Sequence, residues 1–374
     1  MGLCFDLPLG FDAAAAAAAR AEAEGVDGLW TVESDHDPYL PLALAANATR
    51  RVVLGTAISV AFVRSPMVHA MTTWDLHRLA PGRVVLGLGS QVKGHNERRF
   101  SVPFDRPAAR LREMVLAIRA IWRCWQEGVP LDHRGEFYTL TLMTPFFNPG
   151  PVDGAPLPPI YLAAVNPGMI RITGEVADGL HLHPLTSAET LDRFTLPRLR
   201  EAATAAGRDP GSIVLVAPAM LATGRTRAAV DAARERLRGQ IGFYGSTRTY
   251  RPLLEVHGRA AVADRLHELS VAGRWDELAG SVDDELLDAF TIAATWDELP
   301  EAMIRRYAGR VHRVVPYGRL DPEAPWGEIA AAVRAGSQRA GGRLSSASPS
   351  NQPMMAWGSP PTGRVSAQKG EVPA

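Results

Sequence analysis

The sequence has little cysteine and no excess of either charge. Its 374 residues contain only Cys4 and Cys124, too few for a disulfide framework or a cysteine-only metal site, and neither belongs to a C-x-x-C motif. Forty Lys and Arg balance forty Asp and Glu, so the chain lacks the global field that attracts nucleic acid or an anionic membrane. We therefore expect a reducing compartment and a small-molecule partner, with neither nucleic acid nor membrane as a partner.

Long apolar runs are also missing. The N-terminus has no basic segment followed by an apolar one, and Arg20 interrupts the alanine run at 13–19 before it could span a bilayer. These absences predict a cytoplasmic protein. Residues 337–374 are rich in Gly, Ser, Pro and Gln and almost without large apolar side chains, which predicts a disordered C-terminal tail.

What the sequence does contain is an alternation of short β-rich runs with longer helical stretches. Eight runs are predicted to be strands, and their mostly apolar character is typical of a parallel sheet covered on both faces. These strands are residues 3–7, 28–32, 52–60, 83–88, 160–164, 180–183, 213–221 and 311–315. Helices are predicted at 12–24, 41–49, 66–79, 107–125, 169–176, 188–206, 226–238 and 299–307, the first with Asp12 as its N-cap and Gly25 at its end.

Eight strand–helix units predict an α/β fold, the (β/α)8 TIM barrel, which typically takes about 250 residues. We expect the barrel to occupy residues 1–336, with insertions at 126–159 and 241–294 supplying the additional length. The competing open, doubly wound sheet would need a phosphate-binding loop after its first strand. A Pro-Leu-Gly turn at 8–10 follows that strand instead, which favours the barrel.

Active sites of such barrels lie on the loops that follow the strands. The loop after the second predicted strand places three carboxylates and His36 within five positions, 33–37. Neighbouring carboxylates can orient a histidine for proton transfer, so we predict His36 and Asp35 as catalytic residues. Asp37 is predicted to cap the next helix, because Asp-Pro favours a turn.

The end of the fourth predicted strand is a second candidate site. It has the sequence GLGS at 87–90, and two glycines two positions apart allow the close approach of a flat ligand or of backbone. We therefore predict Gly89 and Ser90 as cofactor-binding residues. A tightly packed barrel top would explain the same glycines.

The loop after the fifth predicted strand is a third candidate. It leads through Asn166 directly into a helix that starts close to Gly168 and Met169. The free amides and the positive dipole end of a helix can bind an anion, which predicts a phosphate site here. Asn166 can serve equally well as a helix cap alone.

Two histidines stand two positions apart on the sixth predicted strand and so face the same side. His181 and His183, with Asp35 and His36, could form a metal site of the kind found in metal-dependent hydrolases. Those enzymes more often carry an H-x-H pair at the end of the first strand, where this chain has Phe-Asp-Leu-Pro at 5–8. Pocket lining or a structural role would also explain both histidines.

Four sequence runs, in this order and spacing, resemble the luciferase-like monooxygenase superfamily. They are AEGVDGLW at 23–30, VLGTA at 53–57, PGRVVLGLG at 81–89 and GEVADG at 174–179. The resemblance covers residues 1–336 and looks closest to the branch of coenzyme F420-dependent oxidoreductases, which use a deazaflavin.

The resemblance implies a flavin or deazaflavin at the mouth of the barrel. It implies a non-proline cis peptide at Ser59–Val60, backing the ring of the cofactor, and it places Asp35 and His36 near that ring. The phosphate end of the cofactor would lie against the third candidate site. One departure counts against a sugar phosphate as substrate: relatives that act on one have an acidic residue soon after the strand-four glycines, where this chain has Gln-Val-Lys at 91–93.

These features predict an oxidoreductase that transfers a hydride between coenzyme F420 and a small organic substrate, with His36 as proton donor or acceptor and Asp35 orienting it. With FMN, the same pocket would belong to a two-component monooxygenase that needs a flavin reductase as partner. A metal-dependent hydrolase and a barrel that binds a ligand without catalysis are the further alternatives. The aromatic 241–294 segment is expected either to cover the barrel mouth or to form the interface of a homodimer.

Overall fold

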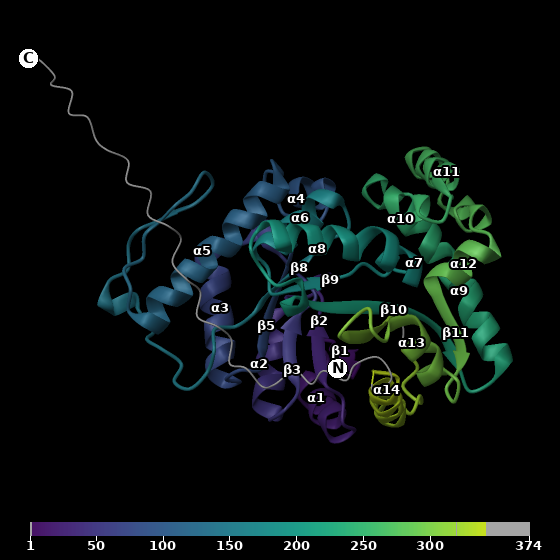
Figure 1. Cartoon of the computed structure of the whole chain (residues 1–374), viewed down its shortest axis with the longest axis horizontal. Coiled ribbons are helices and arrows are strands. Elements are labelled where there is room, and N and C mark those ends of the chain that lie inside the picture. The colour runs from purple at the N-terminus through teal and green to yellow at the C-terminus, as the bar shows by residue number, and fades with distance from the viewer. Residues whose placement is uncertain (1, 319, 342–374) are drawn as a thin grey trace, which may run out of the picture.

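Eight parallel strands close into a barrel in the computed structural model, which describes residues 2–318 and 320–341 (Figure 1). The barrel strands are β1 (Cys4–Pro8), β2 (Gly28–Thr31), β3 (Val53–Thr56), β5 (Val84–Gly89), β8 (Ile160–Ala163), β9 (Gly179–His181), β10 (Val214–Gly224) and β12 (Arg313–Tyr317). Each pairs with the next, and β12 pairs with β1 to close the ring. All eight predicted strands are present, so the predicted TIM barrel is confirmed.

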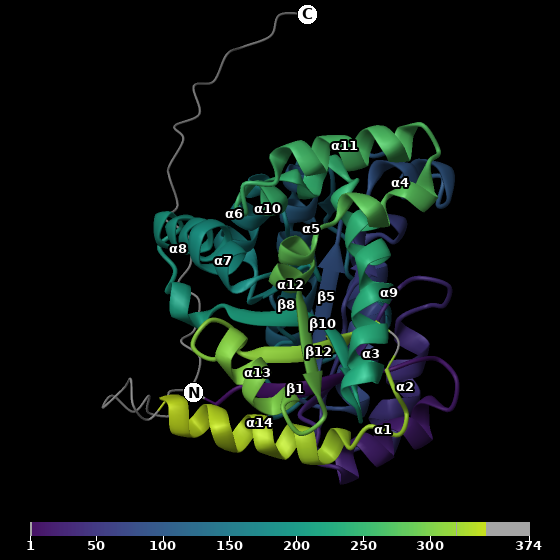
Figure 2. The same cartoon turned by 90° about the vertical axis from the view of Figure 1, so that its right-hand side faces the viewer.

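Helices surround the barrel and connect its strands (Figures 1 and 2). The connecting helices are α1 (Ala14–Ala23), α2 (Tyr39–Ala48), α3 (Pro66–Leu79), α4 (Lys93–Arg98), α5 (Pro107–Glu127), α6 (Pro167–Val176), α7 (Ala188–Thr190), α8 (Leu196–Ala205), α9 (Arg227–Gly245) and α13 (Leu299–Tyr307). A π-helical turn, η3 (Leu191–Thr195), joins α7 to α8 without a break. Within the described ranges, no helix combines the length and apolar character that crossing a bilayer requires.

The predicted helix ends are correct in two of three places. Gly25, with φ 84°, follows α1 in the left-handed conformation that glycine adopts without steric cost. Asp37 stands one residue before Pro38, the N-cap residue of α2, and its Oδ1 accepts the first backbone N–H groups of that helix, from Tyr39 (2.8 Å) and Leu40 (3.3 Å). The prediction for Asp12 was wrong: Ala13 is the N-cap residue of α1 and no side chain caps that end.

The barrel interior is sealed by a polar network rather than by aliphatic side chains alone. Asp6, fully buried, accepts two hydrogen bonds of 2.7 Å from the guanidinium of Arg313 and one of 2.7 Å from the indole N–H of Trp30. Because all these groups have partners, the charges are tolerated inside the barrel. The network closes the barrel below the strand ends.

The two predicted insertions carry more structure than expected. Residues 126–159 add an antiparallel pair, β6 (His133–Arg134) and β7 (Thr139–Leu140). The 241–294 segment begins with the last turn of α9 and continues with α10 (Arg251–Glu255), α11 (Ala260–Val271) and α12 (Asp284–Phe290). It ends in an unpredicted strand, β11 (Thr291–Thr295), which pairs with β10, and Figure 2 shows α10 and α11 at one end of the molecule. The short strand β4 (Ser59–Val60) pairs with β5.

The predicted tail begins too early at residue 337. Helix α14 (Trp326–Gly341) continues through this position, and the hydroxyl of Ser337, which is buried, accepts the backbone N–H of Leu3 at 2.8 Å. A small polar residue therefore ties the last helix to the first strand. The rest of the predicted tail, residues 342–374, lies outside the described residues.

Candidate active site at the barrel mouth

The mouth of the barrel presents a layer of partly exposed side chains. Trp30, Tyr161 and Val315 pack inside the barrel. Side chains alternate along a strand, so the residue two positions after each of these also points into the barrel, one layer nearer the mouth. There Val32 is 50% exposed, and Ala163 and Tyr317 are half-buried. This layer therefore presents partly exposed apolar and aromatic side chains that a flat ligand could contact.

The loop after β2 carries His36 and Asp35 at the surface of this mouth. The imidazole of His36 stacks on the ring of Phe11, from the loop after β1, with 4.9 Å between centroids and 20° between planes. His36 Nε2 lies 3.6 Å from Asp35 Oδ2, too far for a hydrogen bond but close enough for an ion pair when the imidazole is protonated. A hydrogen bond from Ser34 (2.6 Å) lowers the pKa of the Asp35 carboxyl. Phe11, which sequence reasoning missed, holds the ring.

The bulge after β3 contains the expected cis peptide, but at a different bond. The non-proline cis bond joins Ala57 to Ile58, so the prediction of Ser59–Val60 was wrong by two residues. Ser59 and Val60 are fully buried, whereas Ala57 and Ile58 are half-buried. Ala57 and Ile58 are therefore the residues of this bulge that a ligand at the mouth could touch.

Glu33 fixes the position of the bulge. Its carboxylate accepts the backbone N–H of Val60 at 2.7 Å and the hydroxyl of Ser59 at 3.2 Å. Arg64 donates to the same carboxylate at 2.9 Å and to Asp37 at 2.8 Å. Ser59 and Val60 thus can affect a bound ligand only indirectly, by fixing the backbone position of the bulge. Glu33 belongs to the acidic loop that the sequence singled out, but its partners are not adjacent in sequence.

The glycines at the end of β5 are required by the protein's own packing. A Cβ on Gly87 would lie 1.8 Å from the Thr56 carbonyl oxygen, and one on Gly89 would lie 2.8 Å from Ile58 Cδ1. Gly89 is buried and Ser90 is half-buried. The alternative explanation, a tightly packed barrel top, therefore accounts for both glycines. Of Gly89 and Ser90, only Ser90 is exposed enough for a ligand to contact.

The start of α6 offers one free amide. Asn166 caps the helix, since its Oδ1 accepts the N–H of Met169 at 3.0 Å. Pro167 has no N–H, so Gly168 supplies the amide that remains in the first turn. Met169 itself is 6% exposed. An anion here would meet the Gly168 amide and the helix dipole.

His183 lies in an aromatic cluster that sequence reasoning identified only in part. Its ring centroid is 4.1 Å from that of Tyr250 and 4.8 Å from that of Tyr244. The hydroxyls of Tyr244 and Tyr317 are 2.5 Å apart. The beginning of the 241–294 segment therefore reaches the mouth of the barrel, as expected. No local pattern pointed to Tyr317, which comes from the last barrel strand.

Two other aromatic residues of the segment face outward. Phe243 and Trp275 are 53% and 52% exposed, with ring centroids 6.1 Å apart. Phe243 also touches the mouth cluster through Tyr244, with 5.7 Å between the ring centroids. The predicted homodimer interface rests on the exposure of Phe243 and Trp275 and stays a prediction.

The backbone fixes the proton of His183. Its Nδ1 accepts the N–H of Leu185 at 3.1 Å, so the neutral ring carries its proton on Nε2. Desolvation by the surrounding rings lowers the pKa of His183 and keeps the ring neutral at neutral pH. His183 is therefore a fixed N–H donor.

The histidines weighed as an alternative metal site lie in different surroundings. His181 lies inside the barrel, edge-on to Trp30 at 4.9 Å, and burial lowers its pKa to about 3. His36 and His183 lie against different rings, Phe11 and the tyrosines. Among residues 2–318 and 320–341, no group of three or more His, Cys, Asp or Glu is placed to hold a metal ion.

Residues 7–313 match the model of the luciferase-like monooxygenase family. The chain belongs to this family. Its members are oxidoreductases and monooxygenases that use F420 or a flavin, and the resemblance seen in the four sequence runs is thereby confirmed.

Individual relatives are similar in sequence, and a solved structure is similar in fold. An uncharacterised protein of Mycobacterium tuberculosis is 46% identical over 303 residues, covering 81% of this chain and 89% of the relative. The F420-dependent glucose-6-phosphate dehydrogenase of Kineococcus radiotolerans is 36% identical over 216 residues, covering 52% and 59%. Among solved structures, the F420-dependent tetrahydromethanopterin reductase of Methanopyrus kandleri matches with a TM-score of 0.71 and 21% identity, covering 89% and 98%.

Proposed function

We propose that this luciferase-like oxidoreductase transfers a hydride between coenzyme F420 and a small organic substrate at the barrel mouth. The observation that carries the proposal is the layer of partly exposed apolar residues at the mouth, together with two histidines of different character, His36 on the loop after β2 and His183 after β9. The identity to an F420-dependent dehydrogenase of Kineococcus supports the choice of deazaflavin. Its sugar-phosphate substrate is not carried over, because 91–93 holds no acidic residue.

The residues at the mouth fit a flat cofactor with an anionic arm. Val32, Ala57, Ile58 and Ala163 would contact the ring, since their side chains are apolar and partly exposed. The amide of Gly168, at the positive end of α6, would receive a phosphate oxygen. When bound, the deazaflavin supplies or accepts the hydride, and the chain contributes position and electrostatics.

The two histidines have different roles in this proposal. His36 is 53% exposed on its side chain and stands on a loop, so it can exchange a proton with solvent and substrate. His183 is held neutral with its proton on Nε2, so it donates a hydrogen bond and does not act as a base. An oxygen-bearing substrate such as a ketone or secondary alcohol would accept that hydrogen bond.

The test is an activity screen with the full chain and F420. Small ketones, secondary alcohols and imines are supplied in turn, and the absorbance of the oxidised deazaflavin is followed. We expect turnover with oxygen-bearing compounds, loss of about 100-fold or more in His36→Asn, and unchanged cofactor binding in that variant. Full activity in His36→Asn would contradict the assignment of His36 as the proton donor or acceptor.

The second candidate is an FMN-dependent monooxygenase with a flavin reductase as partner, since the family description names monooxygenases. The same preparation supplied with FMN, NADH and a reductase would then consume oxygen in the presence of substrate. Oxygen uptake with FMN and no reaction with F420 would favour this candidate.

A further inference from the structure

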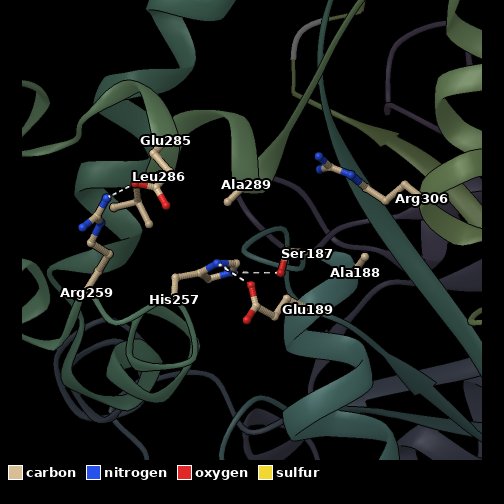
Figure 3. Close-up of a pocket in the computed structure, with 9 residues that line it drawn as sticks. All are labelled: Ser187, Ala188, Glu189, His257, Arg259, Glu285, Leu286, Ala289 and Arg306. Atoms are coloured by element: carbon tan, nitrogen blue, oxygen red, sulfur yellow. Dashed lines mark hydrogen bonds and ion pairs between the residues drawn. The ribbon is translucent and has the colours of Figure 1, made fainter.

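One pocket of the structure is lined by no residue of the barrel strands. It has a volume of about 320 Å³, and all its lining residues come from helices or the links between them (Figure 3). They are Ser187, Ala188, Glu189, His257, Arg259, Glu285, Leu286, Ala289 and Arg306. They belong to α7 with its N-cap residue, to α12 and α13, and to the α10–α11 link. This pocket takes no part in the proposed hydride transfer.

Three of these side chains form a chain of contacts across the pocket. Ser187 Oγ lies 2.9 Å from His257 Nε2, and His257 Nδ1 lies 3.3 Å from Glu189 Oε2 (Figure 3). A carboxylate accepts a proton and does not donate one, so Glu189 favours the proton of His257 on Nδ1. Nε2 is then an acceptor, and the serine hydroxyl donates to it. This is the geometry of a nucleophile, a general base and an orienting acid.

Packing holds the imidazole in this position. The ring of Phe290, from α12, stands edge-on to His257 with 5.1 Å between centroids. His257 is half-buried, and burial lowers its pKa against the opposing effect of Glu189. The ring is therefore neutral at neutral pH and able to accept a proton.

Ser187 retains a lone pair for chemistry although it also caps a helix. Its Oγ accepts the N–H of Thr190 at 2.9 Å. A hydroxyl has one hydrogen and two lone pairs, so donation to His257 and acceptance from Thr190 leave one lone pair for attack. The helical segment 188–205 starts here, and the amides of Ala188 and Glu189 have no acceptor within the helix. They can stabilise negative charge that develops beside Oγ.

We propose that Ser187, His257 and Glu189 form a hydrolytic triad for small carboxylic esters. Ser187 Oγ attacks the carbonyl carbon while its proton passes to His257 Nε2. The C–O bond to the alcohol breaks and the alcohol leaves with that proton, so Ser187 holds the acyl group. Water then attacks the acyl carbon and gives a proton to His257, and His257 returns this proton to Ser187 Oγ as the bond between Oγ and the acyl carbon breaks and the acid leaves. Ester and water become acid and alcohol, with no change in oxidation state.

A fluorophosphonate probe tests the nucleophile directly, using the full chain and intact-mass detection. We expect one probe per wild-type chain, with the peptide that contains Ser187 modified. Ser187→Asn keeps a capping side-chain oxygen but has no hydroxyl, so it should fold and remain unlabelled. Ser65→Ala is the matched control, because the Ser65 hydroxyl caps α3 in the same way, accepting the N–H of Val68, and makes no hydrogen bond to a histidine side chain in the described structure. An unlabelled wild type, or equal labelling of Ser187→Asn, would overturn the proposal.

Hydrolysis of p-nitrophenyl acetate gives a second readout. We expect kcat/KM to fall by about 1,000-fold in Ser187→Asn and by about 100-fold in His257→Gln, as the loss of a nucleophile and of a general base requires. Binding of F420 should be the same in all these variants, so this proposal can fail without the proposed function failing. Hydrolysis that is unchanged in both variants would contradict the triad.

Discussion

The backbone N–H of Leu185 donates to Nδ1 of His183 at 3.1 Å, which places the proton of that imidazole on Nε2. His183 is thereby a hydrogen-bond donor at the mouth of the barrel whose direction is set by the chain itself. In the proposed reaction it positions the substrate, while His36 moves the proton.

This assignment predicts different results for two substitutions of His183. His183→Leu removes the donor and should lower kcat/KM by about 10-fold, the worth of one neutral hydrogen bond. His183→Asn keeps an N–H donor of similar reach and should stay within about three-fold of wild type on the same basis. Steady-state kinetics on the substrate found by the screen measures both, and equal losses would mean that the ring only fills space.

Acid should destabilise the fold through its buried histidines. Burial lowers the pKa of His181 to about 3 and that of His69 to about 4. Both groups stay neutral in the folded chain but take up a proton when unfolded below about pH 6.5. Stability is therefore lost as the pH falls from 6.5 toward 4, by about 1.4 kcal/mol per pH unit for each histidine.

Urea unfolding at pH 7 and pH 5 measures this effect. In His181→Gln the contribution of one histidine is gone, so the difference in unfolding free energy between the two pH values should shrink. An unchanged difference would show that other groups cause the acid sensitivity.

Breaking the buried ion pair of Asp6 and Arg313 should lower the free energy of unfolding far more than breaking an exposed ion pair. Asp6→Asn leaves the guanidinium without its charged partner inside the barrel, so the free energy of unfolding should fall by about 3–5 kcal/mol. Glu301→Gln removes a pair with Arg305 in which both side chains are more than two-thirds exposed, and it should cost less than about 1 kcal/mol. Denaturant midpoints of the two variants measure the contrast, and similar losses would contradict the role given to the interior network.

The carboxylate of Glu33 should matter for cofactor binding although it is buried. Glu33→Gln keeps the size of the side chain but weakens the contacts to Val60, Ser59 and Arg64, so the bulge that carries Ala57 and Ile58 loses its fixed position. We expect the Kd for the cofactor to rise by about 10-fold, which corresponds to one charged hydrogen bond. Asp35→Asn is the control, because its 3.6 Å contact with His36 is not a hydrogen bond. A larger effect in Asp35→Asn would make Asp35, and not Glu33, the structural support of the site.

The sequence was sufficient for the barrel because its strands are continuous apolar runs separated by capped helices. It failed where a contact joins distant segments. Ser337 lies in a stretch of disordered composition, yet it receives the N–H of Leu3. Strand β11 is short and follows a helix directly, so no pattern distinguished it from the preceding segment.

The residues of the candidate site likewise fall into those that the sequence pattern identifies and those that it misses. His36 and Asn166 stand out because they follow strand ends, and both lie where a barrel of this kind places its loops. Tyr317 and Phe11 do not stand out, because their partners Tyr244 and His36 come from distant parts of the chain, helix α9 and the loop after β2. The tautomer of His183 depends on a turn two residues later, which only the folded backbone reveals.

The central claim is that the mouth of this barrel is a deazaflavin site. The most direct measurement is a fluorescence titration of the full chain with coenzyme F420 and, separately, with FMN, using wild type and His36→Asn. The account predicts micromolar or tighter binding of F420 by both proteins and much weaker binding of FMN. Binding of FMN alone would make the protein a flavin-dependent monooxygenase, and binding of neither would contradict the assignment of the barrel mouth as the cofactor site.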